Sequence, residues 1–152
     1  MSEHKAIISW QRGTSGFLNG KYSREHTWTF DGGVTMAASA SPSVVPIPYS
    51  NPAHVDPEEA FVAAISSCHM LTYLYLACRK GFQVDSYNDE ARGVMSKGER
   101  GIPWISEVTL NPKIVYSGER LPTAAEITQL HHDAHEQCFI ANSIKTRVTV
   151  KE

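Results

Sequence analysis

Hydrophobic and polar residues alternate along the first third of the chain and again close to its end. In residues 22–30 the alternation is strict, and one face gathers the larger side chains Tyr22, Arg24, His26, Trp28 and Phe30. A period of two residues is the pattern of a β-strand with one buried face. Asp31, Gly32 and Gly33 follow as a hairpin turn signal. We expect strands over residues 5–10, 22–30, 34–40, 84–95, 104–116 and 144–150.

Apolar residues recur at helical spacing over residues 57–80. Asp56 can cap this helix, Pro57 suits its first position, and Glu59 completes a capping box. Gly81 ends the helix, which at about 1.5 Å per residue is about 36 Å long. Because it is apolar on most faces, we expect it to be buried against more than one surface.

A second helix is expected over residues 123–137, where Thr123 and Glu126 repeat the capping box. Four prolines in residues 41–56 predict an ordered loop that covers a site or an interface. The order β-β-β, helix, β-β, helix, β predicts an α+β fold with mainly antiparallel sheet. A length of 152 residues fits one domain, residues 1–152.

Composition narrows the possible functions. The chain is 41% apolar and 20% charged, with a formal net charge of −2, so nothing attracts nucleic acid or an anionic membrane surface. We see no apolar run of about 18 residues and no secretory leader, and therefore expect a cytoplasmic protein without a membrane span. Three cysteines are a small and odd number, unlike the even set that forms the disulfide framework of a secreted protein.

Two of those cysteines are the strongest candidates for chemistry. Cys68 lies inside the first predicted helix, and Cys138 lies seventy residues later, where the second helix ends. Reduction of a peroxide at sulfur needs an attacking thiol, which becomes a sulfenic acid, and a second thiol that captures it as a disulfide. The alternative for Cys68 is a buried core cysteine. The small residues Ser66 and Ser67 before it and the polar His69 after it favour a reactive thiol, whereas Cys78 is interpreted as structural.

A reactive thiol needs a cation, and Arg24 is the best candidate. A guanidinium lowers the pKa of a neighbouring thiol, and an arginine on a half-buried strand face needs an anionic partner. Glu58 precedes Cys68 by ten residues, which is about 15 Å along one helix. It serves a site at Cys68 only from another copy of the chain or if the segment is not straight; otherwise it is a favourable charge at a helix start.

A competing arrangement could bind a metal. His131, His135 and Cys138 fall on one face of the second helix, and His69, His54 or Cys68 could add a further ligand. The other interpretation is an amphipathic helix whose histidines border the core. A metal- or small-ligand-binding protein is therefore the alternative to a peroxidase.

Two segments resemble the OsmC/Ohr family of thiol peroxidases. One runs from Asp56-Pro57-Glu58-Glu59 to Ser66-Ser67-Cys68-His69, and the other is His135-Glu136-Gln137-Cys138-Phe139-Ile140-Ala141-Asn142-Ser143. The resemblance covers essentially the whole chain. It implies an intertwined homodimer in which antiparallel sheets pack around long central helices, with active sites at the subunit interface.

The resemblance also implies the roles of the site residues. Cys68 matches the peroxidatic cysteine, Cys138 the resolving cysteine, and Glu58 the glutamate that pairs with a catalytic arginine. No arginine lies between Arg24 and Arg79, and Arg24 fits the placement found in the Ohr branch. The expected function is a cofactor-free peroxidase that takes organic hydroperoxides and is reduced by an external dithiol.

Overall fold

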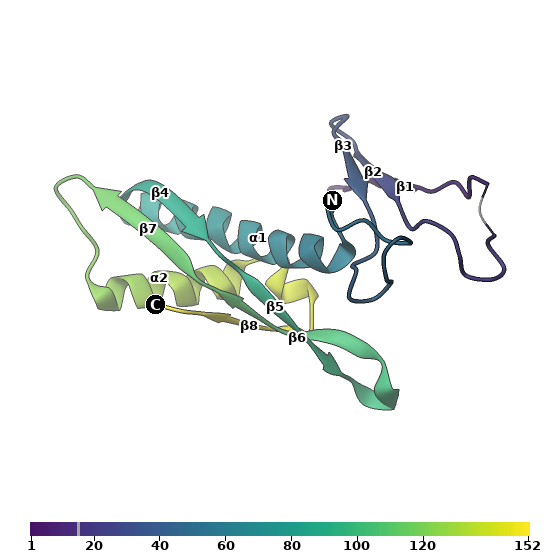
Figure 1. Ribbon diagram of the computed structural model, residues 1–152. Coiled ribbons are helices and arrows are strands. Elements are labelled where there is room, and N and C mark those ends of the chain that lie inside the picture. Colours follow the sequence, from purple (N-terminus) through teal and green to yellow (C-terminus); the bar gives the residue numbers. More distant parts are fainter. Residues whose placement is uncertain (15) are drawn as a thin grey trace. The chain divides into compact units, whose positions relative to one another are not determined.

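The fold is known from a computed structural model that describes residues 1–14 and 16–152 (Figure 1). The chain forms two compact units, Met1–Ala60 and Phe61–Glu152. Two helices and several short, mainly antiparallel sheets make an α+β fold, as the sequence predicts.

The N-terminal unit contains one antiparallel sheet in the order β1 (Ala6–Ser9), β2 (His26–Phe30) and β3 (Thr35–Ala38). The predicted turn joins β2 to β3, and the N–H of Phe30 donates to the carbonyl of Val34. The predicted strand 22–30 is too long, because its first residues leave the sheet. The N–H of Arg24 donates instead to the carbonyl of Tyr49 in the proline-rich loop.

The first helix, α1 (Pro57–Arg79), begins and ends where its sequence signals predict. The N–H of Glu59 donates to Asp56 Oδ1 at 2.8 Å, and the N–H of Asp56 donates back to Glu59 Oε2 at 3.2 Å, which confirms the capping box. Gly81 adopts a φ of 81°, the left-handed conformation that a glycine after a helix takes readily.

Strands and a second helix follow α1 in the C-terminal unit. In chain order they are β4 (Gln83–Asp89), β5 (Arg92–Lys97), the 3₁₀ turn η1 (Glu99–Gly101), β6 (Pro103–Leu110), β7 (Pro112–Ser117), α2 (Ala124–Gln137), the 3₁₀ turn η2 (Ala141–Ser143) and β8 (Arg147–Val150). The strands β4 and β7 pair with each other, and β5, β6 and β8 form a second sheet in which β6 and β8 run parallel.

The two long strands predicted for residues 84–95 and 104–116 are each divided in two. One carboxylate fixes both breaks, because Asp89 Oδ1 accepts the backbone N–H of Asn111 at 2.7 Å while Asp89 Oδ2 accepts the hydroxyl of Ser66. The bond from Ser66 also ties α1 to the end of β4. The alternation of residues predicts a single strand in each case, although the dipeptide Asn111-Pro112 at the second break is a turn signal.

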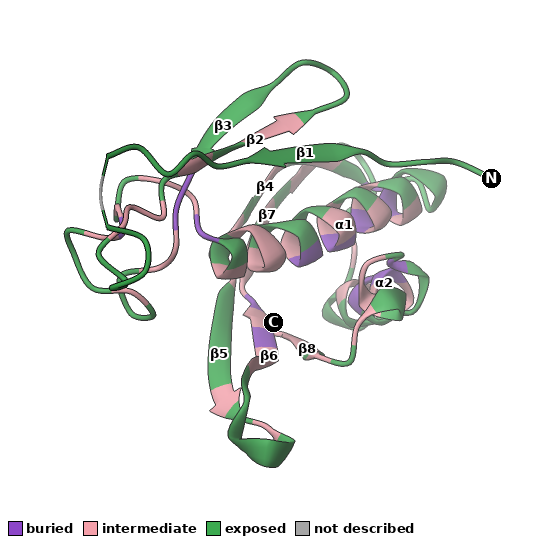
Figure 2. Ribbon diagram, turned by 90° about the vertical axis from the view of Figure 1, so that its right-hand side faces the viewer, coloured by how far each residue is buried: buried purple, intermediate pink, exposed green. Residues whose placement is uncertain are grey.

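Only one side of α1 is buried within the chain (Figure 2). Ile65, His69, Tyr73 and Ala77, four residues apart in turn, form the buried stripe. Leu71 and Tyr75 on another face are 61% and 56% exposed. The expected burial against several surfaces is therefore wrong for the single chain, and the homodimer that would supply a second surface stays a prediction.

Two apolar clusters form the core of the C-terminal unit. Tyr73 and Ala77 of α1 pack with Leu130 and Ala134 of α2, and Phe82 joins them. Ile65 of α1 packs separately with the β6 residues Val108 and Leu110. The long helix is thus the element that both clusters share.

The length and mean hydropathy of 1.5 of α1 also suit a membrane span, contrary to the expectation from the sequence. A core helix of a water-soluble protein passes the same test, so the finding is weak evidence for a membrane. His69 and Tyr73, on the buried stripe, make polar contacts with α2 and β7, which is how a core helix uses its polar residues.

Candidate functional site

The structure brings the side chains of Cys68 and Cys138 together. Cys68 is half-buried on α1, and Cys138 is 1% exposed at the residue that caps the C-terminus of α2. Burial and, to a lesser extent, hydrogen bonding with the Cys68 side chain together raise the pKa of the Cys138 thiol to about 11. Both thiols are free.

A local turn fixes the position of Cys138. Its backbone N–H donates to the carbonyl of His135, and its own carbonyl accepts both the N–H and the side-chain amide of Asn142. The N–H of Ala141 donates to Cys138 Sγ at 3.4 Å. The sulfur is therefore held at the start of η2 with one backbone donor directed at it.

The surroundings of Cys68 are partly polar. The hydroxyl of Thr72 donates to the carbonyl of Cys68 at 2.9 Å. Ser67 is exposed, while Ser66 is engaged by Asp89, so only one of the two small residues leaves open space. Cys78 lies exposed near the end of α1 and does not fill the core.

An apolar groove of about 640 Å³ lies on α1 and the end of α2. Several residues that line it are close neighbours of Cys68 or Cys138 in the sequence. Leu71 and Thr72 follow Cys68 by one helical turn, and Gln137 and Phe139 flank Cys138. Phe139 is 84% exposed. An apolar molecule could bind to this surface close to the cysteine pair.

Arg24 lies in the N-terminal unit, where backbone groups and an aromatic ring hold it. Its Nη1 donates to the carbonyls of Gly20 and Tyr22, and its guanidinium carbon lies 3.6 Å from the centre of the Tyr22 ring. The predicted anionic partner is not found among the described residues of the N-terminal unit, and carbonyl oxygens and a π-face surround the guanidinium instead. No ion pair joins Arg24 to Glu58 within residues 1–14 and 16–60.

Arg24 also lines an apolar cavity of about 520 Å³. Trp10, Phe17 and Tyr22 form its aromatic wall, with ring centres 4.7 to 5.8 Å apart. His26 and Pro57 contribute to the same lining. The cavity therefore combines a fixed positive charge with a surface that suits a hydrocarbon group.

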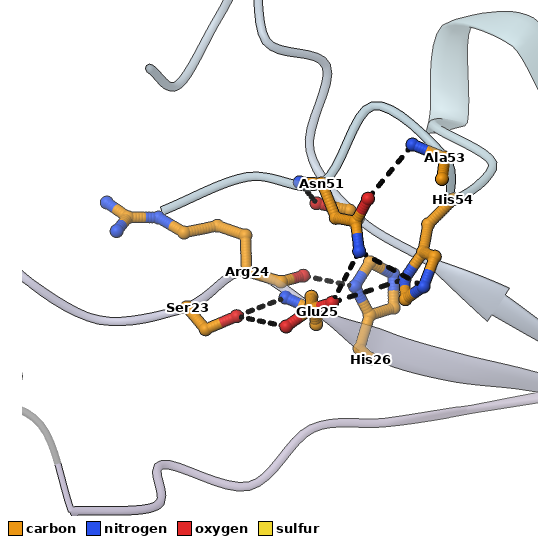
Figure 3. A network of polar contacts seen from close by, with 8 residues as sticks. Ser23, Arg24, Glu25, His26, Asn51, Ala53 and His54 are labelled. Atoms are coloured by element: carbon orange, nitrogen blue, oxygen red, sulfur yellow. Dashed lines mark hydrogen bonds and ion pairs between the residues drawn. The ribbon is translucent and has the colours of Figure 1, made fainter. Parts of the chain in front are cut away.

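A polar network beside Arg24 fixes the loop that precedes α1 (Figure 3). Glu25 Oε1 accepts the side-chain amide of Asn51 at 2.8 Å and lies 3.7 Å from His54 Nδ1. The bonds from Asn51 and Ser23 lower the pKa of the Glu25 carboxyl. The guanidinium of Arg24 points away from this network, so the network positions the backbone on either side of Arg24 and leaves its charge unneutralised.

Glu58 is half-buried in the first turn of α1. Its neighbour Glu59 serves the capping box, and the carboxylate of Glu58 has no hydrogen bond or ion pair with any of the described residues. Because α1 is continuous from Pro57 to Arg79, Glu58 and Cys68 lie about 15 Å apart along one helix. The structure therefore does not bring Glu58 to Cys68 of the same chain.

No metal centre forms from the histidines that the sequence offered. Across residues 1–14 and 16–152, no group of three or more His, Cys, Asp or Glu side chains is arranged to hold a metal ion. His131 instead pairs with a residue of α1, since its Nδ1 lies 3.0 Å from His69 Nε2 and the two rings stack. Sequence reasoning missed this pair, although His69 shares the buried stripe with Ile65 and Tyr73.

The histidine pair is neutral at physiological pH. Burial and, to a lesser extent, the neighbouring His131 and His135 together lower the pKa of His69 to about 4. Burial also lowers the pKa of His131, although the carboxylates of Glu152 and Asp89 oppose the shift. Two uncharged imidazoles can form one hydrogen bond between the helices, in which the N–H of one ring donates to the bare nitrogen of the other.

The comparisons with known proteins agree with this architecture. Residues 50–152 match the family model for OsmC-like proteins. The chain belongs to the OsmC-like protein family. Among curated proteins, none matches it significantly.

Solved structures of OsmC-like proteins share the fold. An OsmC-like protein of unknown function from Vibrio cholerae is 51% identical over 99% of both chains, with a TM-score of 0.96. An organic hydroperoxide resistance protein from Elizabethkingia anophelis is 18% identical over 99% of this chain and 94% of the other, with a TM-score of 0.71. One from Legionella pneumophila is also 18% identical, over 99% and 96%, with a TM-score of 0.69.

The lowered pKa of His69 leads to a prediction of how the free energy of unfolding depends on pH. Its pKa is 6.5 unperturbed and about 4 in the fold, so the unfolded chain takes up the proton first. The free energy of unfolding therefore keeps its full value above pH 6.5. It decreases by up to about 3 kcal/mol as the pH falls from 6.5 through about 4. Denaturant unfolding at a series of pH values should show a shallower loss in His69→Gln, and the wild-type loss in His132→Gln, whose side chain is exposed on α2. An unchanged slope in His69→Gln would contradict the assignment.

Proposed function

We propose that this OsmC-like protein is a thiol peroxidase that reduces organic hydroperoxides with Cys68 and Cys138. The observation that carries the proposal is the contact between these two side chains, from residues seventy positions apart. Two free thiols in contact are the starting arrangement for a reversible disulfide. Membership of the family supports the proposal but does not decide it, because the 51% identical relative has no known function.

The different environments of the two sulfurs indicate which thiol attacks the peroxide and which resolves the sulfenic acid. Cys138 is buried and its pKa is raised to about 11, so at neutral pH it stays protonated and its S–H can donate to a thiolate at Cys68. Cys68 is the more accessible of the two. Cys68 is therefore the attacking thiol and Cys138 the resolving thiol.

The reaction proceeds in balanced steps. The thiolate of Cys68 forms a bond to the distal oxygen of the hydroperoxide, the O–O bond breaks, and the alkoxide takes a proton and leaves as an alcohol. Cys138 loses its proton and attacks the sulfenic sulfur, which releases water and forms the disulfide. An external dithiol then reduces this disulfide by two exchange steps and is itself oxidised to a disulfide.

The proposal assigns the cation to Arg24, with Glu58 as its carboxylate partner. The apolar cavity that Arg24 lines supports a substrate with a hydrocarbon group, and relatives named for organic hydroperoxide resistance point to the same class. Because Glu58 cannot reach Cys68 along its own helix, the proposal includes a homodimer. The exposed apolar residues Leu71 and Tyr75 of α1 give such a dimer a surface to bury.

Serine variants separate the two sulfur roles. With an organic hydroperoxide and a dithiol, Cys68→Ser should lose turnover, since no other thiol is placed to attack. Cys138→Ser should consume about one equivalent of peroxide per chain and then stall, because its sulfenic acid has no resolving partner. Cys78→Ser, which changes an exposed thiol of the same helix, is the matched control and should keep wild-type turnover. Full turnover by Cys68→Ser would rule out the mechanism.

Replacement of Arg24 tests the source of the positive charge. Arg24→Met should slow the oxidation of Cys68 by an organic hydroperoxide at least about tenfold, because a thiolate and a developing alkoxide both lose their cation. Arg92→Met removes an exposed arginine that pairs with Glu90 and should leave the rate unchanged. Stopped-flow measurement of the first oxidation isolates this step from reduction. A wild-type rate in Arg24→Met would show that the cation comes from elsewhere.

A further inference from the structure

A second cavity in the C-terminal unit is lined by neither residue of the cysteine pair, although α2 contributes to both. Its volume is about 360 Å³, and it lies among β7, the first half of α2 and the last two residues of the chain. Ile114 and Ile127 give it apolar walls. Volumes of this order accommodate small organic ligands.

A buried histidine lines this cavity. His131 is 4% exposed, and its Nδ1 is engaged by His69, which leaves Nε2 as the nitrogen that can face the cavity. Among the described residues no group bonds to Nε2. Nε2 is not one of the buried nitrogens that lack a partner, so it is open to the cavity, where a ligand can bond to it.

The partners of the histidine pair determine which nitrogen carries the proton. Nδ1 of His69 is buried and has no hydrogen-bond partner. A buried N–H without an acceptor is rare, so this nitrogen is the bare one and the proton of His69 sits on Nε2. His69 Nε2–H then donates to His131 Nδ1, and the proton of His131 must sit on Nε2. His131 therefore presents an N–H donor to the cavity.

A tyrosine hydroxyl adds a second donor. Tyr73 is fully buried and its hydroxyl contacts that of Tyr116, which is half-exposed and lines the cavity. Tyr73 is the donor in this pair, because its hydroxyl is fully buried and the described residues offer its proton no other acceptor than Tyr116. Tyr116 accepts that bond and keeps its own O–H for the cavity.

Charged groups of both signs lie at the cavity. Lys113 and Lys151 contribute two ammonium groups, and the described residues provide neither with an ion pair. Glu152 contributes one carboxylate, which accepts the hydroxyl of Thr128. Asp89 adds a second carboxylate near His131. Two donors at the wall, with two lysines beside them and apolar walls around them, match a ligand that accepts hydrogen bonds and has an apolar body, and a carboxylate accepts such bonds most strongly.

We infer that this cavity binds a small carboxylate with an apolar body, its carboxylate accepting bonds from His131 Nε2–H and the Tyr116 hydroxyl. The inference does not depend on the peroxidase proposal, since none of these residues belongs to the cysteine pair or to the Arg24 cavity.

Hexanoate is a suitable probe, and hexanamide is its uncharged counterpart of the same shape. Titration of the ¹⁵N-labelled full chain with hexanoate should shift the His131 imidazole resonances to saturation, and the free protein should show the Nε2–H tautomer. Hexanamide should bind at least about tenfold more weakly, because it lacks the charge that strengthens both hydrogen bonds. This comparison uses the unaltered chain, so it does not depend on the folding of a variant.

A matched pair of variants identifies the hydroxyl. Tyr116→Phe should weaken hexanoate binding about tenfold, and Tyr75→Phe, which removes an exposed hydroxyl from α1, should bind as the wild type does. Equal affinity for hexanoate and hexanamide would overturn the carboxylate assignment. The absence of any saturable shift at His131 with either compound would overturn the site itself.

Discussion

The packing of α1 against α2 is the constraint on which the arrangement of this molecule depends. The stripe of α1 that carries Tyr73 and Ala77 packs on Leu130 and Ala134, and the bond between His69 and His131 joins the same two helices. Cys68 lies beside this stripe, and Cys138 ends the helix that packs on it. The contact between the thiols is therefore a consequence of the helix pairing, and a change in that packing would separate them.

The same interface between α1 and α2 contains three buried polar side chains. His69, His131 and Tyr73 are almost completely buried, and each contacts another polar side chain of the group. Such groups cost stability when they are unpaired but specify a single arrangement when paired. The polar pairs thus fix the rotation of α1 relative to α2, which the apolar contacts alone define less strictly. They also direct two hydrogen-bond donors toward the cavity lined by His131 and Tyr116.

The sequence predicts the helices and the fold class well, because capping residues act locally. Asp56 with Glu59 and Thr123 with Glu126 form the bonds expected of them. The division of each long strand depends on Asp89, whose contacts are distant in sequence and leave no periodic signal. The nearness of Cys68 and Cys138 likewise follows from tertiary packing, so the spacing of the cysteines only suggests it. The roles of Arg24 and Glu58 remain predictions, since a single chain does not join them.

The most direct test of the central claim is the mass of the unaltered protein after one equivalent of an organic hydroperoxide, followed by peptide mapping. The account predicts the loss of two hydrogen atoms per chain and a single bridged peptide pair that contains Cys68 and Cys138. The addition of oxygen to Cys68 while Cys138 remains a free thiol would contradict it, because the two sulfurs would then fail to capture each other.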